Sequence, residues 1–218
     1  HIFGRSNFIS NRLIRNPEIA IEIIDSKFLF KKKNLRKMVS ELQFRIDKQT
    51  KLSTNEFKNI LRRYKYEEYL RITVRDLAKL CTFQETLEEL SNIAICCLRI
   101  AFNQITLYEL RSANSLISKS IPKSTENSRP ELFFKHDKKF QTIYPFTIIG
   151  LGKIGGNELN YSSDIDLIFV HDNEKITGDN NQDYKIRMKL ARDLIDTMAD
   201  ITEEGFLARI DVRLRPGG

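Results

Sequence analysis

The sequence predicts an α+β fold in which a helical N-terminal region precedes a small mixed sheet. Glycine is distributed unevenly: of the 9 glycines only Gly4 precedes Gly150, and the front of the chain is rich in residues that favour helices. The apolar pattern then changes from a helical period to short strand-like runs. We therefore expect a helical region at residues 1–117, an exposed connection at 118–144 and a sheet-containing core at 145–218.

Three local patterns predict the helices of the first region. NRLIRNPEIAIEIID suggests a short helix–turn–helix around Pro17. Thr82 and Glu85 form a capping box, which marks the beginning of a long helix. The expected buried faces follow the i, i+3, i+4, i+7 spacing of one helical side. They comprise Phe57, Ile60, Leu61 and Tyr64 in one helix and Leu87, Leu90, Ala94, Cys97 and Ala101 in the next.

The core is expected to follow the order strand, loop, strand, helix, strand. The connection before it is rich in Ser, Lys and Pro and has no period. YPFTIIG and DIDLIFVH predict two strands, and QDYKIRMKLARDLIDTMADIT predicts an amphipathic helix. Gly205 separates this helix from a third predicted strand, FLARIDVRLR. The helix is expected to bury Met188, Ala191, Leu194, Ile195 and Met198.

Composition narrows the class of protein. The 3 cysteines are odd in number and two are adjacent, which argues against a disulfide framework or a zinc site and favours a reducing, cytosolic setting. No uninterrupted apolar run approaches the roughly 20 residues that span a bilayer, and the N-terminus lacks a signal-peptide pattern. We expect no membrane association.

Charge is divided between the two halves of the chain. The net charge is +7, but residues 1–150 hold 27 Lys and Arg against 16 Asp and Glu, whereas residues 151–218 hold 9 against 13. The basic half suits nucleic acid or an acidic protein surface, and a solvated helical face explains it as well. Carboxylates concentrated in the other half, close to a glycine-rich turn, suggest a metal ion.

Two phosphate-handling interpretations compete for the segment 146–172. The glycines of GLGKIGG spell G-x-G-x-x-G after an apolar run, with Asp172 about twenty residues further on, as in a dinucleotide-binding fold. That fold needs a helix between its first two strands, and such a crossover takes at least about 10–12 residues. The seven residues of NELNYSS are too few. We therefore reject the dinucleotide interpretation.

The same segment carries paired carboxylates. Residues i and i+2 of a strand point to the same side, so Asp164 and Asp166 should share one site. Two close carboxylates repel each other, and a divalent cation relieves the repulsion. Asp211 lies in a strand expected to pair beside them, which predicts three acids for two Mg²⁺ ions about 3.5–4 Å apart. The alternative is that Ser163 and Asp164 serve only the turn into the strand.

Two long motifs carry a resemblance. GLGKIGGNELNYSSDIDLIF and IDVRLRPGG are similar to G-K-x-G-G-x-E-L-x-x-S-S-D-x-D-L-I-F and D-x-R-L-R-P-x-G of the bifunctional glutamine synthetase adenylyltransferase/adenylyl-removing enzymes. These belong to the polymerase-beta-type nucleotidyltransferases, so the resemblance implies that residues 145–218 are a polymerase-beta-like catalytic core. LRRYKYEEYLRITVRDLAKL and ETLEELSNIA resemble the same family's helical region.

The resemblance favours one of the family's two modules, and the chain differs from the superfamily pattern at one place. ELNYSSDIDLIF, GFLARIDVRLRP and the opening SNFISNRLIRNPEI look more like the N-terminal, adenylyl-removing half of that family than its second module. Gly152 and Lys153 occupy the place of the superfamily's Gly-Ser, so the usual phosphate-binding serine is absent. The chain stops at Gly218, directly after R-L-R-P, so we expect a catalytic core truncated at its C-terminal end.

The resemblance implies a reaction and its partners. Inorganic phosphate attacks the α-phosphorus of an AMP group on a glutamine synthetase tyrosine, and ADP is released. The implied partners are adenylylated glutamine synthetase, ADP or ATP, phosphate and a nitrogen-signalling regulatory protein, in the cytoplasm. No basic-aromatic pattern supports nucleic acid.

The resemblance further implies roles for the motif residues. Asp164, Asp166 and Asp211 would act as the catalytic residues that hold two Mg²⁺ ions. Lys153 either replaces the missing serine or remains a solvated loop lysine, and Glu158 would orient the loop. The resemblance implies that phosphate is contacted by the backbone N–H groups of three glycines and by the side chains of one lysine, two serines and two arginines. The two serines would otherwise cap the turn. These residues are Gly152, Gly155, Gly156, Lys153, Ser162, Ser163, Arg213 and Arg215.

Two alternatives stay open. The first is the forward reaction, ATP-dependent adenylylation of the same tyrosine by the same kind of site. The second is a regulatory module that reads nucleotide state without catalysis; three intact carboxylates argue against it, because binding alone does not require all three. A polymerase or tRNA nucleotidyltransferase fits the superfamily pattern, but the second motif disfavours it.

Overall fold

The computed structural model describes residue 14 and residues 29–114, 146–171 and 179–212. Pro17 and the expected connection at 118–144 lie outside these ranges. The larger helices are α3 (Leu35–Asp47), α4 (Thr54–Leu77), α5 (Phe83–Asn114) and α8 (Asn180–Ala199). The other elements are the strands β1 (Phe146–Leu151), β2 (Ile165–His171) and β3 (Ile210–Asp211) and the one-turn helix α7 (Gly152–Gly155).

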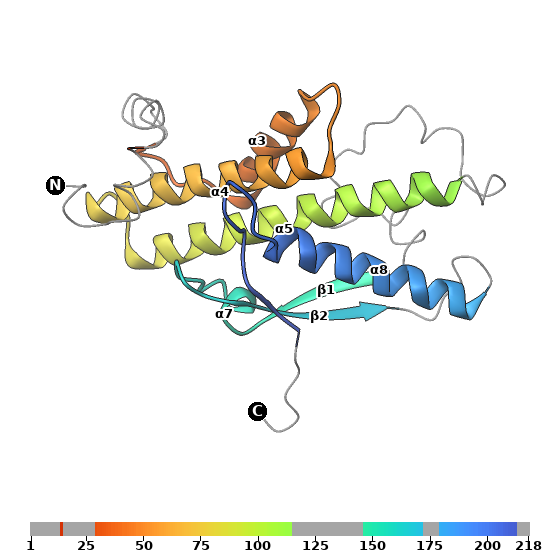
Figure 1. Ribbon diagram of the computed structural model, residues 1–218. Coiled ribbons are helices and arrows are strands. Elements are labelled where there is room, and N and C mark those ends of the chain that lie inside the picture. The colour runs from red at the N-terminus through yellow and green to blue at the C-terminus, as the bar shows by residue number, and fades with distance from the viewer. Residues whose placement is uncertain (1–13, 15–28, 115–145, 172–178, 213–218) are drawn as a thin grey trace.

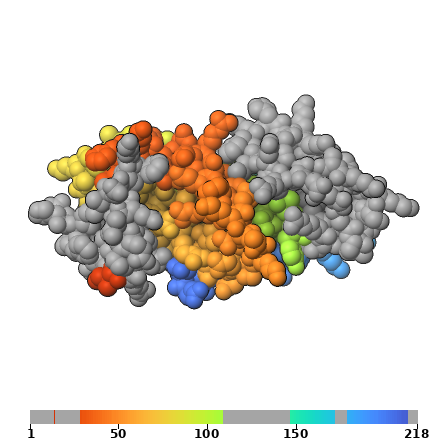
Figure 2. Space-filling view, turned by 90° about the horizontal axis from the view of Figure 1, so that it is seen from above, coloured from red at the N-terminus to blue at the C-terminus, as the bar shows by residue number. Residues whose placement is uncertain are grey.

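The described elements form three layers. Helices α3 and α4 lie on one side, α5 and α8 lie in the middle, and the sheet lies on the other side (Figure 1). Viewed from the α3 and α4 side, these two helices form most of the described surface (Figure 2). The sheet is mixed, because β1 pairs with β2 antiparallel and β2 pairs with β3 parallel. The α+β prediction is confirmed.

Side-chain caps fix where the helices begin. Asn34 accepts a hydrogen bond from the Lys37 amide at 2.9 Å, at the beginning of α3. At α5 the Thr82 amide donates to the Glu85 carboxylate at 2.9 Å, and the Glu85 amide donates to the Thr82 hydroxyl at 3.2 Å. This reciprocal pair is the predicted capping box, and it satisfies two amides that the helix leaves free.

Helix α5 is the central element of one hydrophobic core. The core joins side chains of α3, α4 and α5 to β2, α8 and residues 207–208. The predicted face of α4 is confirmed, since its four apolar residues are at most 6% exposed. Cys96 and Cys97 are buried free thiols, and burial raises the pKa of Cys97 to about 12. They are therefore packing residues, as expected.

One stretch of α5 is long and apolar enough, by length and composition alone, to cross a membrane. This stretch is Phe83–Tyr108, and 56% of its most apolar part is buried inside the protein. Contacts with α3, α4 and α8 explain this burial. The same apolar composition is what the core helix of a folded domain needs.

Two predictions for the C-terminal part are wrong in detail. Met188 is 44% exposed, because the buried stripe of α8 runs through Arg187, Leu190, Leu194 and Met198. The third strand is also shorter than FLARIDVRLR. The Leu207 and Ala208 amides both donate to the Met198 carbonyl at 3.1 Å, so this segment closes the end of α8 before β3 begins.

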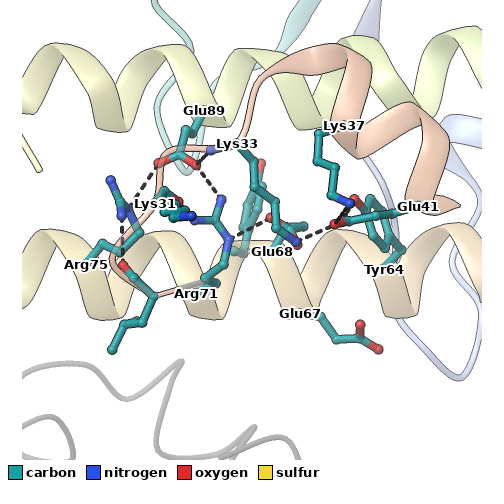
Figure 3. A network of polar contacts seen from close by, with 12 residues as sticks. Lys31, Lys33, Lys37, Glu41, Tyr64, Glu67, Glu68, Arg71, Arg75 and Glu89 are labelled. Atoms are coloured by element: carbon teal, nitrogen blue, oxygen red, sulfur yellow. Dashed lines mark hydrogen bonds and ion pairs between the residues drawn. The ribbon is translucent and has the colours of Figure 1, made fainter. Parts of the chain in front are cut away.

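A network of buried charges joins α3, α4 and α5 (Figure 3). The Lys33 ammonium lies 2.8 Å from a Glu41 oxygen and 2.6 Å from a Glu68 oxygen. The Arg71 guanidinium contacts both Glu68, at 2.8 Å, and Glu89. Burial by itself would raise the pKa of Glu41, but the hydrogen bond and charge of Lys33 outweigh it and lower that pKa. We refer to Lys33, Glu41, Glu68, Arg71, Arg75 and Glu89 as the buried network.

Candidate active site

The glycine turn at the end of β1 lies directly against a carboxylate. Gly152 has φ +53°, and a Cβ on it would be 2.7 Å from Asp166 Oδ2. A Cβ on Gly155 would be 2.7 Å from the Gly150 carbonyl oxygen. Both positions exclude a side chain, the first because of conformation and contact and the second because of contact alone. The turn therefore brings bare backbone to the carboxylate of β2.

The carboxylates lie on the face of the sheet that points away from α5 and α8. Ile165 and Leu167 of β2 are 1% and 3% exposed and pack into the core, whereas Asp164 and Asp166 are exposed. This alternation has the expected two-residue period, whereas the prediction that the two carboxylates share one site stays a prediction. It also explains why D-I-D is tolerated there, since neither charge is buried.

Register places the third carboxylate next to the second. In the sheet Asp166 is the partner of Leu151 on β1 and of Asp211 on β3. Asp211 is partly buried. Adjacent residues of neighbouring strands lie about 5 Å apart, so Asp166 and Asp211 form a pair at the end of the glycine turn.

Asp164 forms an ion pair with Arg209, a residue that sequence reasoning did not single out. The Arg209 Nε lies 2.5 Å from Asp164 Oδ1, and both side chains are exposed. Arg209 also donates to the Ser162 carbonyl oxygen at 3.4 Å. The signal was present in the alternation of ARIDVR, which puts Arg209 two residues before Asp211 and on its side of the chain.

The donor chemistry suits Mg²⁺, but the side chains do not converge on one point. Within the ranges that the structure describes, no three His, Cys, Asp or Glu side chains form a group that could hold a metal ion. The carboxylates are oxygen ligands of the kind that Mg²⁺ prefers, and two of them are in register. The third, Asp164, would have to exchange Arg209 for the ion.

The two predicted serines cap the turn before β2. Asn160 Oδ1 accepts hydrogen bonds from the Ser162 amide at 3.0 Å and from the Ser163 hydroxyl at 2.9 Å. The Ser163 hydroxyl also accepts from the Asn160 amide at 3.0 Å. Sequence reasoning did not single out Asn160, although asparagine at the beginning of a turn is a usual signal. This arrangement fixes the approach to Asp164.

The remaining predicted residues are exposed or lie outside the described ranges. Lys153 is exposed in α7, next to Gly152, and Gly156 closes this turn through its amide, 3.0 Å from the Gly152 carbonyl. Glu158 is exposed in the following loop. Arg213 and Arg215 lie beyond residue 212, so the structure does not describe them.

Helix α4 positions the segment that leads into β3. Arg62 is fully buried, and its guanidinium donates to the carbonyl oxygens of Lys58 (2.8 Å), Thr197 (3.1 Å), Asp200 (2.5 Å) and Gly205 (2.7 Å). Burial lowers the pKa of Arg62. Three of these charge-assisted bonds reach residues 197–205 and are a strong constraint, so the helical region fixes the path of the chain toward Asp211.

Comparison with known proteins agrees with these features. A profile of the glutamate-ammonia ligase adenylyltransferase family matches residues 1–218. The chain belongs to this family. A bifunctional glutamine synthetase adenylyltransferase/adenylyl-removing enzyme of Nitrosococcus oceani is 33% identical over 223 residues, which cover 100% of the chain and 20% of the relative.

Other relatives with the same name locate the similarity more closely. The protein of Shewanella frigidimarina is 32% identical over 225 residues, covering 100% of this chain and 21% of its own length. The protein of Aromatoleum aromaticum is 48% identical over 73 residues, or 33% of this chain and 8% of its own. The chain thus spans about a fifth of the length of the curated relatives that it matches throughout and corresponds to one module of the adenylyltransferase family.

Proposed function

We propose that this member of the adenylyltransferase family catalyses phosphorolytic removal of AMP from a tyrosine of adenylylated glutamine synthetase. The observation that supports the proposal most is the contact between the Gly152 turn and Asp166, which has Asp211 as its register partner. It combines backbone that a phosphate can approach with carboxylates that can hold cations. Family membership supports glutamine synthetase as the substrate protein.

The proposed reaction exchanges a phosphoester bond to tyrosine for the phosphoanhydride bond of ADP. An oxygen of inorganic phosphate forms a bond to the α-phosphorus of the AMP group, and the bond between that phosphorus and the tyrosine oxygen breaks. The products are ADP and a tyrosine whose oxygen takes up the proton released by phosphate. Positioning and charge stabilisation supply most of the catalysis in such transfers, so the chain's own contribution is mainly geometric.

The carboxylates would hold Mg²⁺. Asp166 and Asp211 are in register, and Asp164 would join them after leaving Arg209. When bound, the ions would neutralise the phosphate oxygens and orient the attacking and leaving groups. Asp164, just before β2, and Asp166 within it are both exposed to solvent.

The glycine turn and the basic residues would bind the phosphates. Amides of Gly152 and its neighbours approach closely because no Cβ intervenes, and the exposed ammonium of Lys153 adds positive charge beside them. Arg213 and Arg215 follow Asp211 in the sequence and would stabilise charge that develops on the transferred phosphoryl group. Ser162 and Ser163 would keep Asp164 in place through the capped turn.

The experiment separates removal of AMP from its addition. The chain would be incubated with adenylylated glutamine synthetase, Mg²⁺ and phosphate, and separately with unmodified synthetase and ATP. The proposal expects ADP only when phosphate and metal are both present. AMP transfer from ATP instead would assign the forward reaction to this module, and the absence of both products would reject nucleotidyl transfer by this chain.

Two variants connect the result to the site. Asp166→Asn should abolish ADP release, whereas Asp193→Asn should not, because Asp193 lies on α8 in an exposed pair with Lys189 at 3.6 Å. Equal activity in the two variants would contradict the proposed site. Binding of a nitrogen-signalling regulatory protein and a cytoplasmic location remain predictions beside this one.

A further inference from the structure

A cavity lies on the other face of the sheet, between the helical region and the turn before β2. Its accessible volume is about 240 Å³. Its lining includes Lys65 and Tyr69 of α4 together with Tyr161, Ile165 and Phe206. Ile165 points to the core side of β2, opposite Asp164 and Asp166. The cavity therefore lies on the side of β2 opposite Asp166, and it adjoins the Asp164 part of the candidate site through Ser162, Ser163 and Arg209.

Lys65 places a buried positive charge in this cavity. It is 7% exposed, and its ammonium donates to the Phe206 carbonyl oxygen at 3.1 Å. It also lies 4.8–4.9 Å from the ring centroids of Tyr66, Tyr69 and Phe206. Burial, and secondarily the charge of Arg62, lower the pKa of Lys65 to about 8, against a partly opposing effect of Cys97.

This charge has no anionic partner among the described residues. Each lysine or arginine of the buried network has a glutamate within 4 Å, whereas Lys65 contacts a carbonyl oxygen and ring faces. Arg62 is also buried without a glutamate among the described residues, but four carbonyl oxygens accept hydrogen bonds from its guanidinium. The described lining of the cavity holds no Asp or Glu, and Arg209 at its edge adds a second positive charge. A buried ammonium is costly without a counter-ion.

We propose that the cavity binds a small organic anion, a carboxylate on a flat apolar body. The carboxylate would pair with the Lys65 ammonium, and the flat body would pack against Tyr69, Tyr161 and Phe206. Tyr69 and Tyr161 are already in an edge-on contact, with centroids 5.7 Å apart and planes at 86°, so aromatic rings that can pack against a planar ligand are in place.

The size and the neighbourhood of the cavity limit its ligand. A volume of about 240 Å³ accommodates a molecule with one aromatic ring. Ser162, Ser163 and Arg209 also line the cavity, and Arg209 is the partner of Asp164. Binding of a ligand in the cavity would therefore affect Arg209, which pairs with the proposed catalytic residue Asp164. Ligand binding does not depend on the proposed reaction, so the two proposals can fail separately.

The test uses para-fluorobenzoate as the probe and its neutral amide, para-fluorobenzamide, as the matched control ligand. Fluorine NMR titrations would give the dissociation constant of each with the full chain. We expect the benzoate to bind at least about tenfold more tightly than the amide. Lys65→Met should remove this preference, and Lys153→Met should keep it, because Lys153 is exposed and remote from the cavity lining.

A second readout does not depend on the variant. Carbon NMR of the Lys65 side chain in the unmodified protein would follow its titration with and without each probe. The pKa of Lys65 should rise when benzoate binds, since a counter-ion favours the charged form, and should stay unchanged with the amide. The proposal is overturned if benzoate does not bind, if Lys65→Met binds it equally well, or if the pKa does not move.

Discussion

The buried network and the candidate active site use the same residue types in opposite ways. In the network, Glu89 is 0% exposed and contacts two arginines, Arg71 and Arg75, the second at 3.2 Å. At the site, Asp164 and Asp166 are exposed, and the ion pair of Asp164 with Arg209 is on the surface. The difference between the two regions is burial rather than composition.

This difference determines what each set of charges can do. Buried carboxylates with fixed partners cannot exchange them without leaving a charge uncompensated, so they specify how α3, α4 and α5 pack (Figure 3). Exposed carboxylates lose little when they change partners, which is what a cation-binding site needs. Charge in the network should therefore affect stability, and charge at the site should affect activity.

The largest expected effect is on activity at the site. Asp166→Asn should lower ADP release by at least about a thousandfold, since it removes a charge that would hold the cation, and should change the free energy of unfolding by less than about 0.5 kcal/mol. Steady-state assays and urea unfolding measure the two quantities. A variant that is inactive and also strongly destabilised would show that the two regions do not differ as described.

The next effect is on stability in the network. Glu89→Gln should lower the free energy of unfolding by about 3–5 kcal/mol, because it leaves Arg75 buried without a carboxylate among the described residues and removes one of the two carboxylates of Arg71, which keeps Glu68. Its neighbour Glu88 is the matched control, since it is one-third exposed and its ion pair among the described residues is with the equally exposed Lys32. Glu88→Gln should cost less than about 1 kcal/mol. Equal losses in urea unfolding would refute the distinction by burial.

Lys65 provides a third case for comparing buried and exposed charges, because it is a buried cation that has no carboxylate partner among the described residues. Its folded pKa of about 8 lies below the usual 10.5, so the unfolded state binds more protons between these values and stability rises with pH there. The shift corresponds to about 3 kcal/mol. Relative to Lys65→Met, the wild-type protein should gain stability by up to that amount from about pH 7 to about pH 10. A pH-independent difference in urea unfolding would contradict the assignment.

The smallest effect is expected at the glycine turn. Gly152→Ala should cost about 1–2 kcal/mol of stability, because a side chain is disfavoured at φ +53°, and it should also reduce activity by displacing Asp166. Gly156→Ala is the control, since the nearest atoms to its Cβ would be 3.6 Å away. Thermal unfolding and ADP release would compare them. A harmless Gly152→Ala would remove the argument for close backbone approach.

The features that could be predicted from sequence are local. The capping box of Thr82 and Glu85 depends on a spacing of three residues, and the shared side of Asp164 and Asp166 depends on the period of a strand. The short loop after Gly156 was enough to exclude the dinucleotide fold, and β1 and β2 are indeed antiparallel neighbours. Such features follow from backbone geometry alone.

The features that could not be predicted depend on contacts between distant residues. Arg62 is in a basic stretch that suggests a solvated surface, yet it is fully buried because α4 packs against the turn around Gly205, 143 residues away. The ion pair of Arg209 with Asp164 depends in the same way on the pairing of β2 with β3. The sequence shows both partners but not that they meet.

The most direct test of the proposed function follows the phosphate itself. Adenylylated glutamine synthetase would be incubated with the chain, Mg²⁺ and radiolabelled inorganic phosphate, with Asp166→Asn and Asp193→Asn in parallel. Phosphorolysis predicts that the label appears in the β-phosphate of ADP for the unmodified protein and Asp193→Asn, but not for Asp166→Asn. Unlabelled AMP as the released nucleotide, or labelled ADP from Asp166→Asn, would contradict the proposed reaction or its site.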